Sequence, residues 1–181
     1  MSVVISGTGL FTPSEYITNE ELVASFNNYV AKFNEDNKEL IAAGDLEALA
    51  PSSSEFIKKA SGIEQRFVQD KRGILDINRM RPKLDERPNS QISILAEMGI
   101  KASKDAINQA EISASDLDAV ICGCSNLQRA YPAVAIEIQE ELGINGYAYD
   151  MNVACSSATF SIQNAFNDIQ SGVADKILVV N

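Results

Sequence analysis

The 181-residue sequence contains no histidine. Histidine is the usual general base beside a nucleophilic serine or cysteine, and it is the commonest transition-metal ligand. Its absence excludes a complete Cys-His or Ser-His pair within these residues. The three cysteines have spacings that match neither a disulfide framework nor a zinc site, so we expect no bound metal. Any nucleophile in this chain must therefore obtain its base from elsewhere.

Positive charge and long apolar runs are also scarce. The sequence has 15 Lys and Arg against 25 Asp and Glu, a net charge of −10, and no Lys/Arg cluster. Binding to phosphate backbones needs such clusters, so we expect no nucleic-acid partner. No run approaches the roughly 20 apolar residues of a membrane helix, and the N-terminus lacks the basic region of a signal peptide. We expect a cytoplasmic protein without membrane insertion, in a reducing compartment.

The second half of the sequence alternates between strand and helix patterns. Two kinds of residue mark the helix ends. Pro132 falls in the first turn of a predicted helix, and Gly143 ends the same helix. Apolar strands separated by helices predict an α/β fold in which helices cover both faces of a parallel sheet. The expected elements are a helix at 92–110, a strand at 117–124, a helix at 131–143, a strand at 147–152, a helix at 155–171 and a strand at 176–181.

The first 90 residues are less regular. Val3 to Ile5 predict a short buried strand that ends in a glycine turn, and a helix from about Asn19 to Phe33 has Thr18 or Asn19 as its N-cap. Residues 66–69 predict another short strand.

Two polar segments, at about 34–55 and 70–90, interrupt the regular pattern. The first contains only a short amphipathic piece at 38–43, and the second has charge, prolines and no period. Both are predicted to be insertions outside the layered fold.

Cys155 is the candidate nucleophile. It stands in "MNVACSSATF", where an apolar strand gives way to small hydroxylated residues and a helix. Unpaired N–H groups and the positive end of the helix dipole at a helix start favour a thiolate, and the same groups could donate to an oxyanion during attack on a thioester. The alternative is a small buried hydrophobe at an ordinary junction. The helix that follows places on one face Ala158, Ile162, Ala165, Phe166 and Ile169.

Two other motifs are interpreted as structural. Cys122 and Cys124 have period two on a predicted strand, so they need only be small side chains on one face. The "GTG" at 7–9 lacks the third glycine of a dinucleotide fingerprint and predicts a tight turn. We therefore expect no cofactor.

Three stretches carry a resemblance to a known family: residues 7–22, "SGIEQR" at 61–66, and the run from Ala130 to Asn181. In the last run, a proline-led helix, a glycine, an aromatic-Asp strand and then Ala-Cys-Ser before a helix follow in order. This order resembles the N-terminal half of the ketoacyl synthase III family within the thiolase-fold condensing enzymes.

The resemblance implies one of two pseudo-symmetric halves of a thiolase-like fold, a five-layer αβαβα arrangement in the whole enzyme. Residues 1–181 would form the N-terminal half, with the C-terminal half absent. It implies that Cys155 takes an acyl group from a thioester, at the start of a helix buried near the centre of the molecule. The catalytic His and Asn of the family belong to the other half, in agreement with the missing histidine.

The implied reaction is the decarboxylative Claisen condensation of an acyl thioester with malonyl-acyl-carrier-protein, through an acyl-Cys155 intermediate, in fatty-acid or polyketide initiation. The implied substrates are acyl-CoA or the phosphopantetheine of acyl carrier protein, and the implied assembly is a homodimer. Alternatives are a non-decarboxylating condensation, as in hydroxymethylglutaryl-CoA synthase-like or head-to-head condensing enzymes, and a non-catalytic dimer partner. We expect the 181-residue segment alone to be inactive.

Two positions depart from the family or have two interpretations. Phe56 stands where the family has a tryptophan that stacks on the adenine of coenzyme A, and Ala60 replaces an arginine. Phe56 could still stack on the adenine; the alternatives are that the primer donor is held differently or is a carrier protein. Tyr131 falls where the family places an aromatic residue that closes the partner's acyl pocket, or it simply caps the start of a helix. The two insertions would build a lid or a wider pocket for a medium-chain acyl group.

Overall fold

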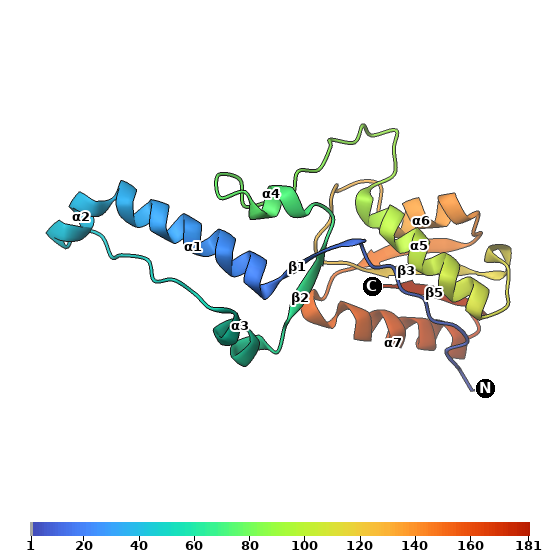
Figure 1. Cartoon of the computed structure of the whole chain (residues 1–181). Helices are drawn as coiled ribbons and strands as arrows, with labels where there is room; N and C mark the ends of the chain where they lie inside the picture. The colour runs from blue at the N-terminus through green and yellow to red at the C-terminus, as the bar shows by residue number, and fades with distance from the viewer. Residues whose placement is uncertain (1) are drawn as a thin grey trace. The chain divides into compact units, whose positions relative to one another are not determined.

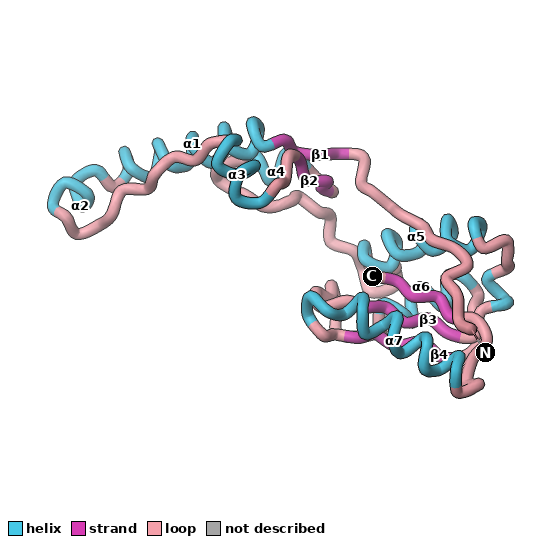
Figure 2. Tube along the Cα trace, turned by 90° about the horizontal axis from the view of Figure 1, so that it is seen from below, coloured by secondary structure: helices cyan, strands magenta, loops and turns pink. Residues whose placement is uncertain are grey.

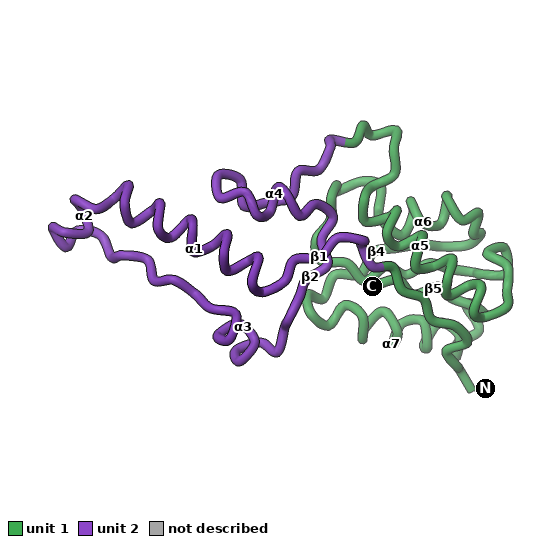
Figure 3. The backbone as a smooth tube through the Cα atoms, in the orientation of Figure 1, with its two compact units in different colours: residues 1–11, 87–181 green, residues 12–86 purple. Residues whose placement is uncertain are grey.

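The computed structural model describes residues 2–181, a mixture of helices and strands (Figure 1; Figure 2). The chain divides into two compact units (Figure 3). The chain up to Phe11 together with residues 87–181 forms the first, which we call the sheet unit. Residues 12–86 form the second, which we call the α1 unit.

A three-stranded parallel sheet is the centre of the sheet unit, with the strand order β4-β3-β5. Ile121 of β3 lies opposite Tyr149 of β4 and Val179 of β5. Because the strands are parallel, their carboxyl ends lie at one edge of the sheet. The strands are β3 (Ala119–Gly123), β4 (Tyr147–Met151) and β5 (Ile177–Val180).

Helices cover both faces of this sheet, which confirms the predicted α/β class. Helix α7 packs on one face, and α5 and α6 pack together on the other (Figure 1). The helices are α5 (Ile94–Gln109), α6 (Val134–Leu142) and α7 (Ser157–Gln170), with short 3₁₀ turns η1 (Ala114–Asp116) and η2 (Ala154–Ser156).

The hydrophobic core lies between the sheet and the α5–α6 layer. Val120 and Cys122 point into it from β3, as their two-residue period predicts. Small residues let the two helices approach closely: a Cβ atom on Gly99 would come within 2.8 Å of the Cδ1 atom of Ile138. Ile138 is fully buried, which contributes on the order of 2 kcal/mol.

Helix α7 packs on its face of the sheet differently from our expectation. Its buried residues are the small Ser157, Ser161 and Ala165, four residues apart, whereas Ile162 and Phe166 are exposed. The reason is the short distance between helix and sheet, because a Cβ atom on Gly123 would lie 2.9 Å from the Ser161 Oγ atom. The face with large apolar residues that the sequence predicted is therefore not the face against this sheet.

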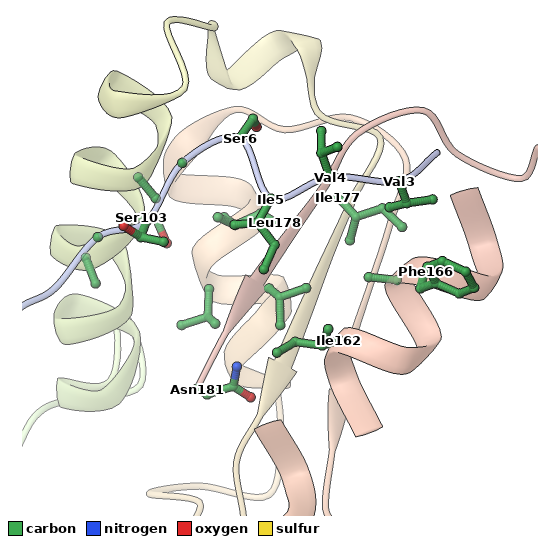
Figure 4. Close-up of a pocket in the computed structure, with 18 of the residues that line it drawn as sticks. Val3, Val4, Ile5, Ser6, Ser103, Ile162, Phe166, Ile177, Leu178 and Asn181 are labelled. Atoms are coloured by element: carbon green, nitrogen blue, oxygen red, sulfur yellow. The ribbon is translucent and has the colours of Figure 1, made fainter. Parts of the chain in front are cut away.

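The predicted buried strand at Val3 to Ile5 is wrong. This segment forms no strand, and Val4 and Ile5 are 76% and 75% exposed. The following residues are held on α5 instead, since the Thr8 hydroxyl donates to Gln109 Oε1 at 2.9 Å and the Leu10 N–H to Asp105 Oδ2 at 3.3 Å. A cavity of about 520 Å³ lies between the N-terminal segment and β5 (Figure 4).

The α1 unit contains a short antiparallel sheet and four helices among residues 12–86. Thr18 is the N-cap of α1, in a reciprocal capping box with Glu21, which decides between the two caps that the sequence allowed. The strands are β1 (Glu15–Thr18) and β2 (Gln65–Val68), and the helices are α1 (Asn19–Asp36), α2 (Lys38–Ala43), α3 (Ser54–Ser61) and α4 (Lys71–Leu75). Strand β1 and helices α3 and α4 were not predicted.

The segment at 34–55 is ordered by side-chain amides. It contains the end of α1, the helix α2 at the predicted residues 38–43, and an extended chain that runs back along α1 (Figure 2). Asn34 bonds to both the N–H and the C=O of Leu49, each at 2.9 Å. Asn27 does the same for Ser52, at 2.9 and 3.0 Å. Two asparagines seven residues apart on α1 thus take the place of a neighbouring strand.

The segment at 70–90 folds around one carboxylate. Asp70 accepts from the Gly73 N–H at 3.1 Å at the start of α4 and from the Lys83 N–H at 2.6 Å. Bonds from backbone N–H groups, that of Lys83 above all, keep the pKa of Asp70 below its usual value.

No helix formed by residues 2–181 is long and apolar enough to cross a membrane.

Asp118 joins the beginnings of all three parallel strands. Its carboxylate accepts from the N–H groups of Lys176 at 2.9 Å and Asp175 at 2.8 Å, before β5. Its C=O accepts from the Tyr147 N–H at 3.3 Å, at the start of β4. The bonds from Lys176 and then Asp175 hold the pKa of the Asp118 carboxyl below its usual value.

We expect Asp118→Asn to destabilise the protein at neutral pH and to make less difference in acid. The pKa of Asp118 is depressed by folding, so its contribution is complete above the unfolded value near 3.8 and is lost as the pH falls through the folded value. Urea unfolding of both proteins at pH 7 and at about pH 3 measures this. The exposed Asp45→Asn is the control, and a difference that is independent of pH would contradict the assignment.

Candidate active site

The loops that follow the parallel strands meet at the carboxyl edge of the sheet. Gly123 pairs with Met151, and Cys122 with Val180, so the chain leaves all three strands at the same level. The Cys124 N–H donates to the Met151 C=O at 3.0 Å and continues the pairing past the strand ends. This edge therefore brings together the loop at 124–133 and the turn that contains Cys155.

Cys155 is an exposed free thiol in the turn η2, between β4 and α7. The alternative that it is a small buried hydrophobe is wrong for this chain. The predicted helix start is also two residues too early, because α7 begins at Ser157. The N–H groups of Ser156 and Ser157 bond to the C=O groups of Val153 and Ala154 within the turn, so these two are not free for an anion.

The residue before Cys155 has a strained backbone. Ala154 has φ +47°, in the left-handed region that costs a residue with a Cβ atom about 1–2 kcal/mol. Such outliers persist only where surrounding bonds hold them. The Ala154 N–H donates to Asn152 Oδ1 at 3.2 Å, and the Ala154 C=O accepts from the Ser157 hydroxyl at 2.8 Å. Ser157 also accepts from the Val153 N–H at 3.0 Å.

Asp150, near the end of β4, caps helix α6. Its two carboxylate oxygens accept from the N–H groups of Val134 and Ala135 at 2.9 and 2.8 Å. A carboxylate at a helix N-terminus satisfies free N–H groups and interacts well with the helix dipole. This cap from a distant strand explains why α6 begins at Val134 and not at the predicted residue 131.

Tyr131 lies in the loop before α6. Its side chain is 87% exposed, and its peptide bond to Pro132 is cis. Because Asp150 supplies the cap, the interpretation of Tyr131 as the residue that caps the helix start is wrong. The interpretation as part of a dimer interface stays a prediction.

A buried carboxylate fixes the loop at 124–133 against α5. Glu137 of α6 accepts from the Ser93 N–H at 2.8 Å and from the Ser93 hydroxyl at 2.7 Å, and Arg129 Nη1 lies 3.9 Å from it. Gln128 Oε1 accepts from the Ile94 N–H at 2.8 Å. Side chains of this loop therefore bind the first residues of α5.

The other two cysteines differ from Cys155 in their surroundings. Cys122 is buried in the core, where burial and then the charge of Asp150 raise the pKa of its thiol to about 12. Cys124 is partly exposed, and its Sγ atom lies 3.5 Å from the Asn126 C=O. Cys122 therefore stays a neutral thiol, as expected of a small core residue.

Phe56 lies on α3 of the α1 unit, whereas Cys155 and Tyr131 belong to the sheet unit. Phe56 is 65% exposed, and its stacking on a ligand stays a prediction. Its N–H donates to the Ser53 hydroxyl at 3.1 Å, so the helix cap fixes its backbone.

Sequence reasoning missed the roles of Ser157, Asp150 and Glu137. The sequence showed Ser157 only as one of the small hydroxylated residues between the strand and the helix. A serine directly before a helix interior is a residue type that often bonds to local backbone, and this signal was available. The bonds of Asp150 and Glu137 join residues 15 to 44 positions apart, which no local pattern indicates.

Comparison with known proteins places the chain in a family. Residues 89–180 match the model of the thiolase N-terminal domain. The chain is 60% identical over 157 residues to the beta-ketodecanoyl-acyl-carrier-protein synthase of Pseudomonas aeruginosa, covering 87% of this chain and 45% of that protein. It is 32% identical to the beta-ketoacyl-acyl-carrier-protein synthase III of Dinoroseobacter shibae, covering 98% of this chain and 41% of that protein.

A solved structure supports the fold. The crystal structure of 3-oxoacyl-acyl-carrier-protein synthase III from Aquifex aeolicus superposes with a TM-score of 0.68 at 24% identity, covering 97% of this chain and 42% of that one. The chain thus spans less than half the length of these relatives. Its predicted fold, one half of the thiolase fold, is confirmed, and the chain belongs to the thiolase family, with beta-ketoacyl-acyl-carrier-protein synthases III among its relatives.

Proposed function

We propose that Cys155 accepts an acyl group from a thioester in a condensing enzyme of which these residues are part. The observation that carries the proposal is an exposed thiol on a strained turn, at the carboxyl edge of a parallel sheet and directly before a helix. In open α/β sheets, ligands bind outside the carboxyl ends of the strands. Strained backbone near a reactive group is a common sign of a functional turn.

The proposed first step is acyl transfer. The Cys155 thiolate attacks the thioester carbonyl, a C–S bond to Cys155 forms, and the bond to the donor's sulfur breaks. The donor leaves as a thiolate, which takes up the proton that Cys155 released. The donor is coenzyme A or the phosphopantetheine of acyl carrier protein, so the chemistry uses no further cofactor.

The proposed second step is decarboxylative condensation. Malonyl-acyl-carrier-protein loses CO₂, the resulting carbanion forms a C–C bond to the acyl carbonyl, and Cys155 leaves as a thiolate. A histidine and an asparagine outside these 181 residues would assist decarboxylation and stabilise the oxyanion. The proposed setting is initiation of fatty-acid or polyketide synthesis by a cytoplasmic homodimer, in which Tyr131 contacts the partner's acyl pocket.

The proposed primer is a medium-chain acyl group. The relative from Pseudomonas aeruginosa is named for a beta-ketodecanoyl product, and it shares 60% identity with this chain. A cavity of about 310 Å³ in the α1 unit is bordered by Ile74 and Met80 of the segment at 70–90 and by Ser52 of the segment at 34–55. We propose that these segments widen the acyl pocket or close over it.

Octanoyl-CoA should label Cys155 of the full-length protein faster than acetyl-CoA. Intact-mass spectrometry should find one added acyl group, which Cys155→Ala removes because the acceptor sulfur is lost. Cys124→Ala is the matched control and should retain labelling. Labelling that persists in Cys155→Ala would contradict the nucleophile, and a preference for acetyl-CoA would contradict the medium-chain primer.

Phe56→Ala should raise KM for octanoyl-CoA by about fivefold with little change in kcat, because stacking is worth about 1 kcal/mol and acts on donor binding. Phe56→Trp should restore the lower KM. Phe67→Ala removes another exposed ring from the α1 unit and serves as the control. Equal kinetics for Phe56→Ala and the wild type would show that Phe56 does not stack on the donor.

The 181-residue chain by itself should form no ketoacyl product from octanoyl-CoA and malonyl-acyl-carrier-protein. It lacks a histidine to assist decarboxylation. Release of labelled CO₂ from malonyl-acyl-carrier-protein measures this step, with the full-length protein as the positive control. Steady CO₂ release and ketoacyl product from the 181-residue chain would contradict the proposed division of catalytic groups.

A further inference from the structure

Ser157 is buried, and its hydroxyl bonds to residues that precede its own helix. It is the first residue of α7 and is only 5% exposed, while its neighbours Cys155 and Ser156 are exposed. Its hydroxyl makes two bonds, accepting from the Val153 N–H and donating to the Ala154 C=O. Both partners precede the helix, so Ser157 is not a helix cap.

The two bonds enclose the strained residue. Val153 and Ala154 are the last two residues before Cys155, and the Ser157 hydroxyl joins the N–H of one to the C=O of the other, at 3.0 and 2.8 Å. An alanine held at φ +47° returns to an ordinary conformation unless its flanking peptides are fixed. The Ala154–Cys155 peptide, whose C=O accepts the hydroxyl bond, sets the direction of the Cys155 side chain.

Other bonds around the turn do not replace this one. Asn152 Oδ1 accepts the Ala154 N–H at 3.2 Å from an exposed side chain, and the Ser156 N–H bonds to the Val153 C=O at 3.0 Å. Neither bond reaches the Ala154 C=O. The Ser157 backbone N–H does bond to that C=O, but only the hydroxyl links it to the Val153 N–H on the other side of Ala154. Ser157 is thus the buried side chain that fixes the peptide next to the candidate nucleophile.

We propose that Ser157 is a positioning residue, whose hydroxyl holds Ala154 in the left-handed conformation and thereby aims the Cys155 thiol at the thioester. This inference rests on the proposed acyl transfer to Cys155. Without the hydroxyl, Ala154 relaxes, the Ala154–Cys155 peptide rotates, and the thiol moves away from the line of attack. A displacement of about 1 Å can reduce a rate about 100-fold.

The test compares acylation of Cys155 by octanoyl-CoA in variants of the full-length protein. Ser157→Ala should lower the maximal acylation rate by about 10- to 100-fold with a smaller change in the donor concentration for half-saturation, because geometry and not donor binding is altered. Ser157→Thr keeps the hydroxyl and should restore most of the rate. Ser171→Ala removes a hydroxyl bond to Asp168 at the other end of α7 and is the matched control, with a rate near wild type.

A second change separates positioning from stability. Glycine adopts the left-handed conformation without strain, so Ala154→Gly should lower the acylation rate less than Ser157→Ala does. In the double variant Ala154→Gly/Ser157→Ala, the glycine should restore most of the acylation rate that Ser157→Ala loses, even if the thermal stability stays low. If Ser157→Ala alone does not fold, the double variant still allows the acylation rate to be measured without the hydroxyl. A double variant that folds but is as slow as expected of Ser157→Ala would overturn the proposal.

Alkylation by iodoacetamide makes the two proposals distinguishable. Its rate at Cys155, measured relative to Cys124 in the same molecule, reports on the turn without requiring acyl transfer. A wild-type protein that is alkylated but never acylated at Cys155 would contradict the proposed function. If Ser157→Ala then shows the wild-type alkylation ratio, the positioning role is overturned as well. Wild-type acylation in Ser157→Ala, with only a lower melting temperature, would overturn the positioning role alone.

Discussion

The in-register parallel pairing of β3 with both β4 and β5 is the constraint on which the rest of the sheet unit depends. It directs every loop after a strand to one edge and the helices to the two faces. A slip of one residue would turn Asp150 away from α6, because side chains alternate between faces. It would leave the N–H groups of Val134 and Ala135 without their carboxylate and would free the loop that carries Tyr131. The arrangement around Cys155 is therefore a property of the sheet as a whole.

The spacing of apolar residues, together with the glycine and proline residues at helix ends, predicted most of the sheet unit. The alternation of apolar strands with helices ending at Gly143 and Gly172 needed only local rules, and the parallel sheet followed from the alternation. The errors arose where distant residues decide. Val3 to Ile5 have the composition of a buried strand, yet anchoring of the next residues on α5 leaves them unpaired. Strand β1 exists only because it pairs with β2, 50 positions along the chain.

The candidate site was predictable in its chemistry and not in its geometry. The position of Cys155 before a helix was visible in the sequence, as was the need for a base from elsewhere. The left-handed Ala154 was not, because alanine rarely adopts this conformation and carries no local signal for it. Neither was the direction of the Ser157 hydroxyl, which bonds backward to the turn and not forward to its own helix. Both are set by bonds among residues 152–157, and the residue types alone do not specify which of these bonds form.

Cys122 and Cys155 differ in solvent exposure, and this difference sets the order in which they react with oxidants. The two sulfurs belong to neighbouring parts of one sheet edge, but burial keeps Cys122 protonated while Cys155 stands in solvent. Oxidants and electrophiles arrive through water, so they reach the exposed turn before they reach the core. Oxidants would therefore modify Cys155 of this chain while the core stays intact, and a reducing agent would reverse the first oxidation step without any refolding.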